Sequence, residues 1–201
     1  MRLPTHDAGA GRILRRRDGR EAAAPDAEHL GVSRLQDPNY VLTLDGRYLF
    51  EGSPLDVFST MAQVDDFPGW WKWLRDYEIH GGGLQAGGVL SGLVVPPIPY
   101  TFHVSIHVDD VDPGRNIRAR LRGDLDGDAQ VWLDDHPAGC ELKIRWDVEM
   151  RKPAMRAAAR FCRPLLVWGH DHVIEIAVRR FREALAQRLH GTPMVPHAPR
   201  V

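Results

Sequence analysis

Apolar and polar side chains alternate one by one through much of the chain from Tyr77 to Met150. The cleanest run covers residues 140–150, where every second residue from Cys140 through Trp146 to Met150 is apolar and the residues between them are charged. Glycines and prolines divide the stretch into shorter segments. The alternation predicts an antiparallel sheet with one dry face and one solvated face.

A helical period replaces the alternation near the C-terminus, in residues 164–189, PLLVWGHDHVIEIAVRRFREALAQRL. At about 100° per residue, one side of this segment gathers apolar residues: Leu166, Val173, Ile176, Ala177, Phe181 and Ala184. The segment is predicted to be one long amphipathic helix that needs an apolar partner surface. Pro164 is expected to separate it from a short helix just before it, because proline breaks a helix interior.

The first ordered elements are predicted after residue 40. Residues 41–53, VLTLDGRYLFEGS, also alternate and predict a strand through residues 48–50, with Asp45-Gly46 as a turn signal. Ser53-Pro54-Leu55-Asp56 has the residues typical of a helix start: serine at the N-cap, proline next and an acid in the first turn. Residues 65–73 predict a turn and a second short helix.

The predicted order of elements is strand, two short helices, antiparallel strands and one long helix. A curved antiparallel sheet closed by a single C-terminal helix is an α+β fold. One helix need not fill such a sheet along its whole length, so an apolar cavity is expected between them. The predicted domain covers residues 41–190. Residues 1–40 form a disordered or loosely attached extension, and residues 191–201 form a tail.

The composition narrows the choice of partners. The formal net charge of −1 gives no overall field that favours nucleic acid. Two cysteines without a CxxC motif exclude a disulfide framework, so a reduced, cytoplasmic setting is expected. No apolar run approaches the roughly 20 residues of a membrane span. The apolar cavity expected between the sheet and the helix makes a hydrophobic small molecule the expected partner, and the sequence leaves a homo-oligomer open.

Strand parity and the helical wheel select the residues expected to bind a ligand. The dry positions include Phe102, Val104, Leu121 and Trp146, none of which is an acid, a base or a nucleophile. The helix contributes Val173 and His170. Trp70 and Trp71 are candidates for the mouth of the cavity, and Tyr77, Tyr100 and Trp132 are candidate hydrogen-bonding aromatics.

His170 is the candidate catalytic residue, because it lies within the apolar side of the helix whereas His172 points roughly opposite. A histidine there can act as a general acid or base near neutral pH. The alternative is a core histidine that packs the end of the helix. Asp171 is not expected to orient it, because neighbours in a helix do not face each other.

No metal or cofactor site is predicted. His103 and His107 lie on one face of a strand but roughly 13 Å apart by strand rise, too far for one metal ion. Asp124, Asp126 and Asp128 begin like a calcium loop, yet Ala129 occupies the position where that loop requires glycine.

Several local motifs resemble the START-like (SRPBCC) superfamily, in particular its polyketide cyclase/dehydrase-type proteins. They are residues 48–50 before 53–58, Phe67-Pro68-Gly69-Trp70-Trp71, the strand pair with Gly123, Gly127 and Trp132, and Trp168-Gly169-His170-Asp171-His172. The resemblance covers about residues 45–190. It implies a helix-grip fold with a deep cavity between the sheet and the C-terminal helix, where members bind hydrophobic or aromatic molecules.

The leading hypothesis is the binding of a polyketide- or lipid-like molecule in that cavity. A second hypothesis is a polyketide aromatase/cyclase with His170 as general acid/base. A third is a protein-interaction module, which a large exposed apolar patch would favour. A fold shared by many functions does not choose among them.

Overall fold

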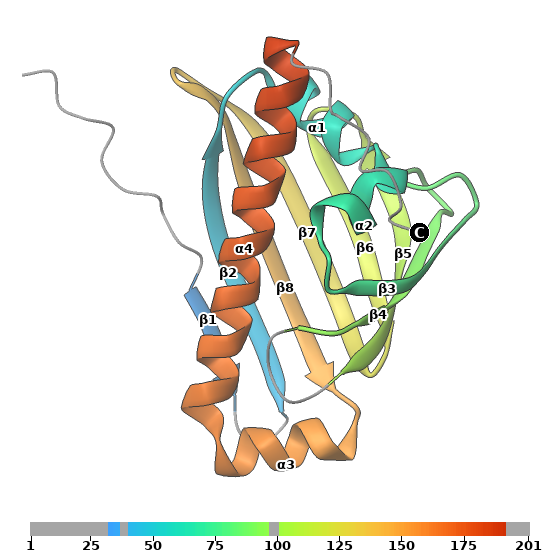
Figure 1. The fold of residues 1–201 in the computed structure, drawn as a ribbon, viewed down its shortest axis with the longest axis vertical. Helices are drawn as coiled ribbons and strands as arrows, with labels where there is room; N and C mark the ends of the chain where they lie inside the picture. The colour runs from blue at the N-terminus through green and yellow to red at the C-terminus, as the bar shows by residue number, and fades with distance from the viewer. Residues whose placement is uncertain (1–31, 37–39, 97–100, 192–201) are drawn as a thin grey trace, which may run out of the picture.

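One antiparallel sheet of eight strands, in the order β1-β2-β8-β7-β6-β5-β4-β3, is the basis of the fold. The computed structural model describes residues 32–36, 40–96 and 101–191 (Figure 1). The strands are β1 (Val32–Gln36), β2 (Val41–Phe50), β3 (Leu74–His80), β4 (Val89–Val94), β5 (Phe102–Asp112), β6 (Asn116–Gly123), β7 (Leu125–His136) and β8 (Gly139–Met150).

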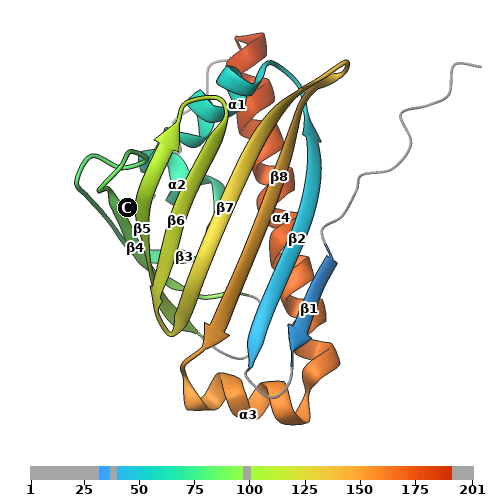
Figure 2. The ribbon, with the colours of Figure 1, turned by 180° about the vertical axis from the view of Figure 1, so that it is seen from behind.

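The helices all lie at one face or one end of this sheet. They are α1 (Pro54–Met61), the 3₁₀ turn η1 (Val64–Asp66), α2 (Phe67–Trp70), α3 (Pro153–Phe161) and α4 (Arg163–His190). Figure 1 shows α4 running along the inner face and α3 crossing one end of the sheet. Figure 2 shows the outer face, which no helix of the described chain covers. The predicted α+β fold, with two short helices after the main first strand, is confirmed.

The local signals predicted several boundaries correctly. Ser53 caps α1 through its hydroxyl, which accepts a hydrogen bond from the Asp56 backbone N–H, and the Asp56 carboxylate accepts one from the Ser53 N–H. The Ser53 hydroxyl also donates to the Asp56 carboxylate at 2.7 Å, and this bond, with the smaller contribution of the bond from the Ser53 N–H, lowers the pKa of Asp56. The long helix begins at Arg163, immediately before Pro164, as predicted.

Two predictions near the N-terminus are wrong. Asp45-Gly46 is not a turn, because β2 runs straight through it and Gly46 pairs with Ile144. The glycine is there because a Cβ would meet the Tyr48 ring at 2.8 Å. In addition, β1 lies inside the segment 1–40 set apart as an extension, and it pairs antiparallel with β2. The rest of that segment, apart from Tyr40, and the tail from residue 192 lie outside the described residues.

The alternation places apolar side chains on the inner face across neighbouring strands. Ala129 on β7 lies opposite Ala119 on β6 and Trp146 on β8, and Val131 lies opposite Ile144 in the next inward row. The sheet therefore presents a continuous apolar surface to α4.

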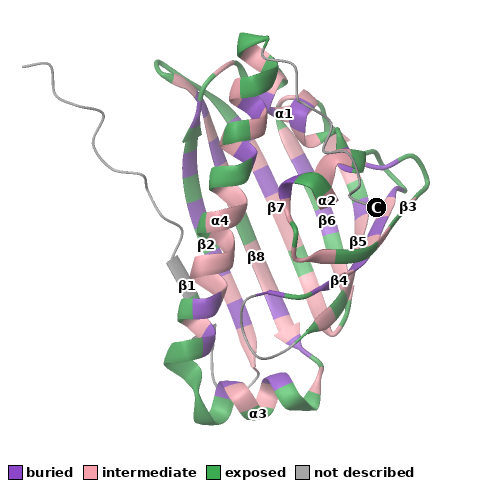
Figure 3. Cartoon of the chain, in the orientation of Figure 1, coloured by how far each residue is buried: buried purple, intermediate pink, exposed green. Residues whose placement is uncertain are grey.

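The buried residues form two separate cores rather than one. The large core lies around the C-terminal half of α4 and comprises Tyr48, Phe50, Val57, Trp70, Val108, Ile117, Val131, Leu133, Cys140, Leu142, Phe181 and Leu185. The small core lies where α3 meets α4 and comprises Leu42, Val148, Met150, Met155, Ala159 and Leu166. Within α4, no residue between Gly169 and Phe181 is fully buried, and Figure 3 shows this stretch as intermediate or exposed.

Candidate ligand-binding site

The candidate site is the band of the inner face between the two cores. Side chains here retain accessible surface although α4 lies over the sheet. The inner band, as we define it, comprises Val104, Ile106, Leu121, Ala129, Ile144, Trp146, His170 and Val173, all partly buried. Apolar residues at the centre of a sheet covered by a helix are normally packed tightly. Their residual exposure indicates that α4 does not fill the space above them.

Small side chains form the floor of the inner band. Ala119 and Ala129 lie opposite each other on β6 and β7, and Gly127 lies opposite Leu121. Gly127 cannot be larger, because a Cβ there would lie 2.0 Å from the Asp147 carbonyl oxygen. Three small residues in neighbouring positions leave room between the sheet and the helix. The sequence contains this signal, because alanine and glycine occupy three inward positions of the alternating strands.

Trp146 gives the inner band a polar group. Its indole Nε1 is buried and has no hydrogen-bond partner among the described residues. A buried donor without an acceptor costs about 1–3 kcal/mol. The His170 ring meets the Trp146 ring edge to face, with centroids 5.5 Å apart and planes at 88°. An occupant of the band with an acceptor oxygen could satisfy the indole N–H.

His170 points toward the sheet, as the helical wheel predicted. Its side chain is 15% exposed, whereas that of His172 is 41% exposed and stacks on Trp168. The His170 Nδ1 lies 3.6 Å from Asp171 Oδ1, which is longer than a hydrogen bond. The two residues thus form a loose contact rather than a hydrogen-bonded catalytic pair.

A second set of buried polar atoms lies beside α2. The Tyr77 Oη and the Trp73 Nε1 are buried, and neither has a hydrogen-bond partner in the part of the chain that the structure describes. Burial, with a smaller contribution from Asp65, raises the pKa of Tyr77 to about 12. The Tyr77 ring lies 6.1 Å from that of Phe67, so this phenol borders the large core.

The remaining predicted site residues divide into three groups. Phe102 packs against the small core, next to the inner band. Trp70 is buried in the large core, where its ring centroid lies 5.8 Å from that of Phe181. Trp71 donates a hydrogen bond from its Nε1 to the Ala177 carbonyl oxygen, at 3.3 Å. These two tryptophans hold α2 against α4, and neither belongs to the inner band. Tyr100 lies outside the described residues.

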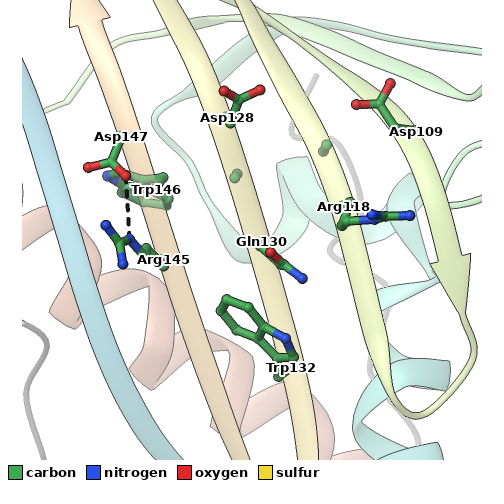
Figure 4. A pocket seen from close by; sticks show the side chains of 10 residues that line it. Asp109, Arg118, Asp128, Gln130, Trp132, Arg145, Trp146 and Asp147 are labelled. Carbon is green, nitrogen blue, oxygen red and sulfur yellow. Dashed lines mark hydrogen bonds and ion pairs between the residues drawn. The ribbon is translucent and has the colours of Figure 1, made fainter.

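The placement of Trp132 inside the cavity is wrong. Its neighbours Val131 and Leu133 are buried on the inner face, so Trp132 points outward between Asn116 and Lys143. It lines an open outer pocket of about 390 Å³, with Asp109, Arg118, Ala119, Asp128, Ala129, Gln130, Arg145, Trp146 and Asp147 (Figure 4). Strict alternation along β7 places Trp132 on the outer face, opposite to Val131 and Leu133.

Charged pairs cover the rest of the outer face. Arg118 bonds Asp110 at 2.9 Å, and these side chains are 59% and 49% exposed. The Arg120 guanidinium lowers the pKa of Asp109 through a direct hydrogen bond. Solvated pairs of this kind contribute little to stability. In the described chain, no three His, Cys, Asp or Glu side chains come together as a metal site would require.

Comparison with other proteins shows similarity of fold rather than of sequence. No family model and no curated protein sequence matches the chain. The Zhui aromatase/cyclase from Streptomyces sp. R1128 superposes with a TM-score of 0.61 at 14% identity, over 77% of this chain and 99% of the other. A conserved protein from Geobacillus kaustophilus also gives 0.61 at 14% identity, covering 72% and 95% of the two chains.

A third match, Ara h 8.0201, has a TM-score of 0.53 at 17% identity and covers 76% of this chain and 99% of its own. The chain has the START-like helix-grip fold. The START-like architecture matches the predicted arrangement of the sheet and the C-terminal helix. At these identities the likeness establishes the fold alone. No helix of the described chain is long and apolar enough to cross a membrane.

Proposed function

We propose that this START-like protein binds a hydrophobic or aromatic small molecule between its sheet and α4. The observation that supports this most is the inner band, where apolar side chains keep accessible surface between two closed cores. Ligand sites are typically apolar with a few polar groups that fix orientation. The Trp146 N–H and the His170 ring supply such groups.

The chemistry of the inner band indicates the class of ligand. Its walls are aliphatic, with Ile106, Leu121 and Ile144 on the sheet and Val173 on the helix. A flat, mostly apolar molecule with one hydrogen-bond acceptor suits these walls and the indole donor. One of the similar structures is named an aromatase/cyclase, which fits a polyketide-like ligand, and a lipid-like ligand has the same requirements.

Adjacent residues on β7 provide a matched test. Ala129 lies on the inner face, in line with the buried Val131 and Leu133, whereas Gln130 alternates with them and points outward. The neutral fluorescent probe N-phenyl-1-naphthylamine should bind the wild type saturably. Ala129→Phe should weaken binding about tenfold or more, because the ring would fill the band, whereas Gln130→Phe should leave the affinity unchanged. Absence of saturable binding, or equal effects of both variants, would reject the proposal.

A second candidate function is cyclisation of a linear poly-β-ketone with loss of water. The position of His170 beside Trp146 favours it, because histidine can transfer protons near neutral pH. His170→Ala should then abolish the cyclised product, measured by mass spectrometry, while probe binding stays within a few fold. Unchanged product formation in this variant would remove the catalytic role and leave the binding proposal intact.

A further inference from the structure

The corner where α3 meets α4 exposes an unusual amount of apolar surface. Phe161 is 80% exposed, Trp168 56% and Leu165 48%, and they lie within eight residues of one another. Figure 1 shows that the two helices meet at the edge of the molecule, and Figure 3 shows the corner as exposed. We call Arg160–Leu165 and Trp168 the apolar corner. Large exposed apolar side chains that cluster in this way mark an interaction surface.

The charge around the apolar corner has one sign. Between Glu149 and Asp171 the chain has no acidic residue, and its basic residues are Arg151, Lys152, Arg156, Arg160 and Arg163. Every exposed residue in 151–170 is either apolar or basic. Three of these five residues are paired with acids: Arg151 with Asp126 and Glu149, Lys152 with Asp124, and Arg156 with Glu149. The exposed residues of this stretch nevertheless carry charge of one sign, whereas those of the outer face include both acids and bases.

Not all of these basic residues are equally available. Arg156 binds Glu149 and the Met150 carbonyl oxygen, and Lys152 binds the Thr101 carbonyl oxygen. Arg160 is exposed at the end of α3, directly beside Phe161. An arginine next to a protruding aromatic ring can reach a phosphate group while the ring enters an apolar layer.

We propose that the apolar corner docks this protein on the surface of a membrane that contains anionic lipids. Trp168 and Phe161 would enter the interface between headgroups and acyl chains, where aromatic rings are favoured. Arg160 and its basic neighbours would lie at the level of the phosphates. The apolar corner is a surface contact and not a membrane span. It is separate from the inner band and goes beyond the proposed ligand binding.

The same charge pattern disfavours a second copy of the chain as the occupant. A two-fold symmetric contact places the same patch of both copies face to face. Arg160 would then meet its own equivalent, and the apolar corner itself contains no acidic residue. An anionic bilayer complements both the charge and the apolar side chains.

Vesicle flotation tests the proposal with the full chain. Wild-type protein should bind vesicles of phosphatidylcholine and phosphatidylglycerol, and bind vesicles of phosphatidylcholine alone about tenfold less. Phe161→Ala and Trp168→Ala should each weaken binding about tenfold, and Arg160→Glu should do the same at low salt. All three side chains are exposed, so these variants should keep the thermal stability of the wild type.

Two matched controls lie elsewhere on the surface. Leu55 on α1 is 57% exposed, and Arg179 is exposed near the middle of α4. Leu55→Ala and Arg179→Glu should bind vesicles like the wild type. If the controls weaken binding as much as the corner variants, or if the wild type fails to float with anionic vesicles, the proposal is overturned.

The exposed Cys162 reports on the same surface independently. It lies between the two helices, whereas Cys140 is buried and its pKa is raised to about 11, chiefly by burial. A neutral, water-soluble maleimide should label Cys162 rapidly in solution and about tenfold more slowly when anionic vesicles are present. Unchanged labelling with vesicle-bound protein would contradict docking through the apolar corner.

One further result would overturn the proposal in favour of a second copy of the chain. That result is self-association of the wild type in the absence of vesicles, if Trp168→Ala abolishes it.

Discussion

The two ends of α4 are held in different ways. Its C-terminal half buries Phe181 and Leu185 in the large core, which also receives α1, α2 and five strands. Its N-terminal half buries Leu166 and Gly169 over the small core, and on the opposite side exposes Trp168. Both halves expose one side to solvent. The covered side of the C-terminal half packs into the large core, and that of the N-terminal half packs over the small core.

This difference shows how one helix can both stabilise a sheet and leave space above it. The large core supplies enough packing to fix α4, so the middle of the helix does not have to pack tightly. The inner band between the cores is therefore free to be shaped by small residues such as Ala119 and Ala129. A fold with one continuous core would lose that freedom, because close packing tolerates few voids.

The largest predicted loss of stability comes from a substitution in the large core. Phe181→Ala should lower the free energy of unfolding by about 4 kcal/mol, because it removes a buried ring that contacts Phe50 and Trp70 edge to face. Chemical denaturation measured by circular dichroism gives the value. Phe161→Ala, which truncates a ring that is 80% exposed, is the matched control and should change the stability little. Equal losses in the two variants would show that the large core does not fix the helix.

A smaller effect is expected in the small core. Leu166→Ala should lower the free energy of unfolding by about 2 kcal/mol, which is at the low end of the range for a buried leucine. The loss is small because the space that the side chain leaves adjoins the accessible inner band. The same denaturation experiment measures it. A loss as large as that of Phe181→Ala would contradict the difference between the two ends.

The smallest predicted loss of stability comes from the ionisation of Tyr77 and appears only at high pH. Burial raises the pKa of Tyr77 from 10.0 to about 12, so its neutral form is favoured in the folded state. Below pH 10.0, the pKa of tyrosine in the unfolded chain, Tyr77 is neutral in both states and the stability is complete. As the pH rises toward 12, only the unfolded chain ionises, and stability is lost. After allowance for partial exposure of the ring, the loss is roughly 2 kcal/mol.

Tyr77→Phe should remove this loss of stability at high pH. It should leave the stability at neutral pH nearly unchanged, since the Tyr77 hydroxyl bonds to no described residue. Unfolding by urea at pH values from neutral to strongly alkaline measures both variants. A variant with the same pH dependence as the wild type would mean that water reaches this side of the large core.

Periodicity predicted the parts of the fold that depend on local pattern. The alternation of residues 140–150 corresponds to β8, and the helical period of 164–189 corresponds to α4 within one residue at each end. Ser53 and Asp56 fixed the start of α1 because capping is a local interaction. The five residues of β1 are too short for a periodic signal, and they are a strand only because β2 offers them an edge.

The candidate site was predictable only in part. The wheel placed His170 inward correctly, since the side of a helix follows from sequence spacing. The division into two cores was not predictable, because it depends on how far α4 stands above the sheet at each position. The anchoring of Trp71 to the Ala177 carbonyl oxygen likewise joins segments 106 residues apart, and no local pattern encodes such a contact.

Methyl nuclear magnetic resonance during titration with N-phenyl-1-naphthylamine tests the central claim most directly. The inner band should take up the probe, so the methyl signals of Ile106, Leu121 and Ile144 should shift together and saturate. Those of Val57 and Leu185, enclosed in the large core, should not move. Shifts confined to the large core, or no saturable shift in the inner band, would contradict a ligand site between the sheet and α4.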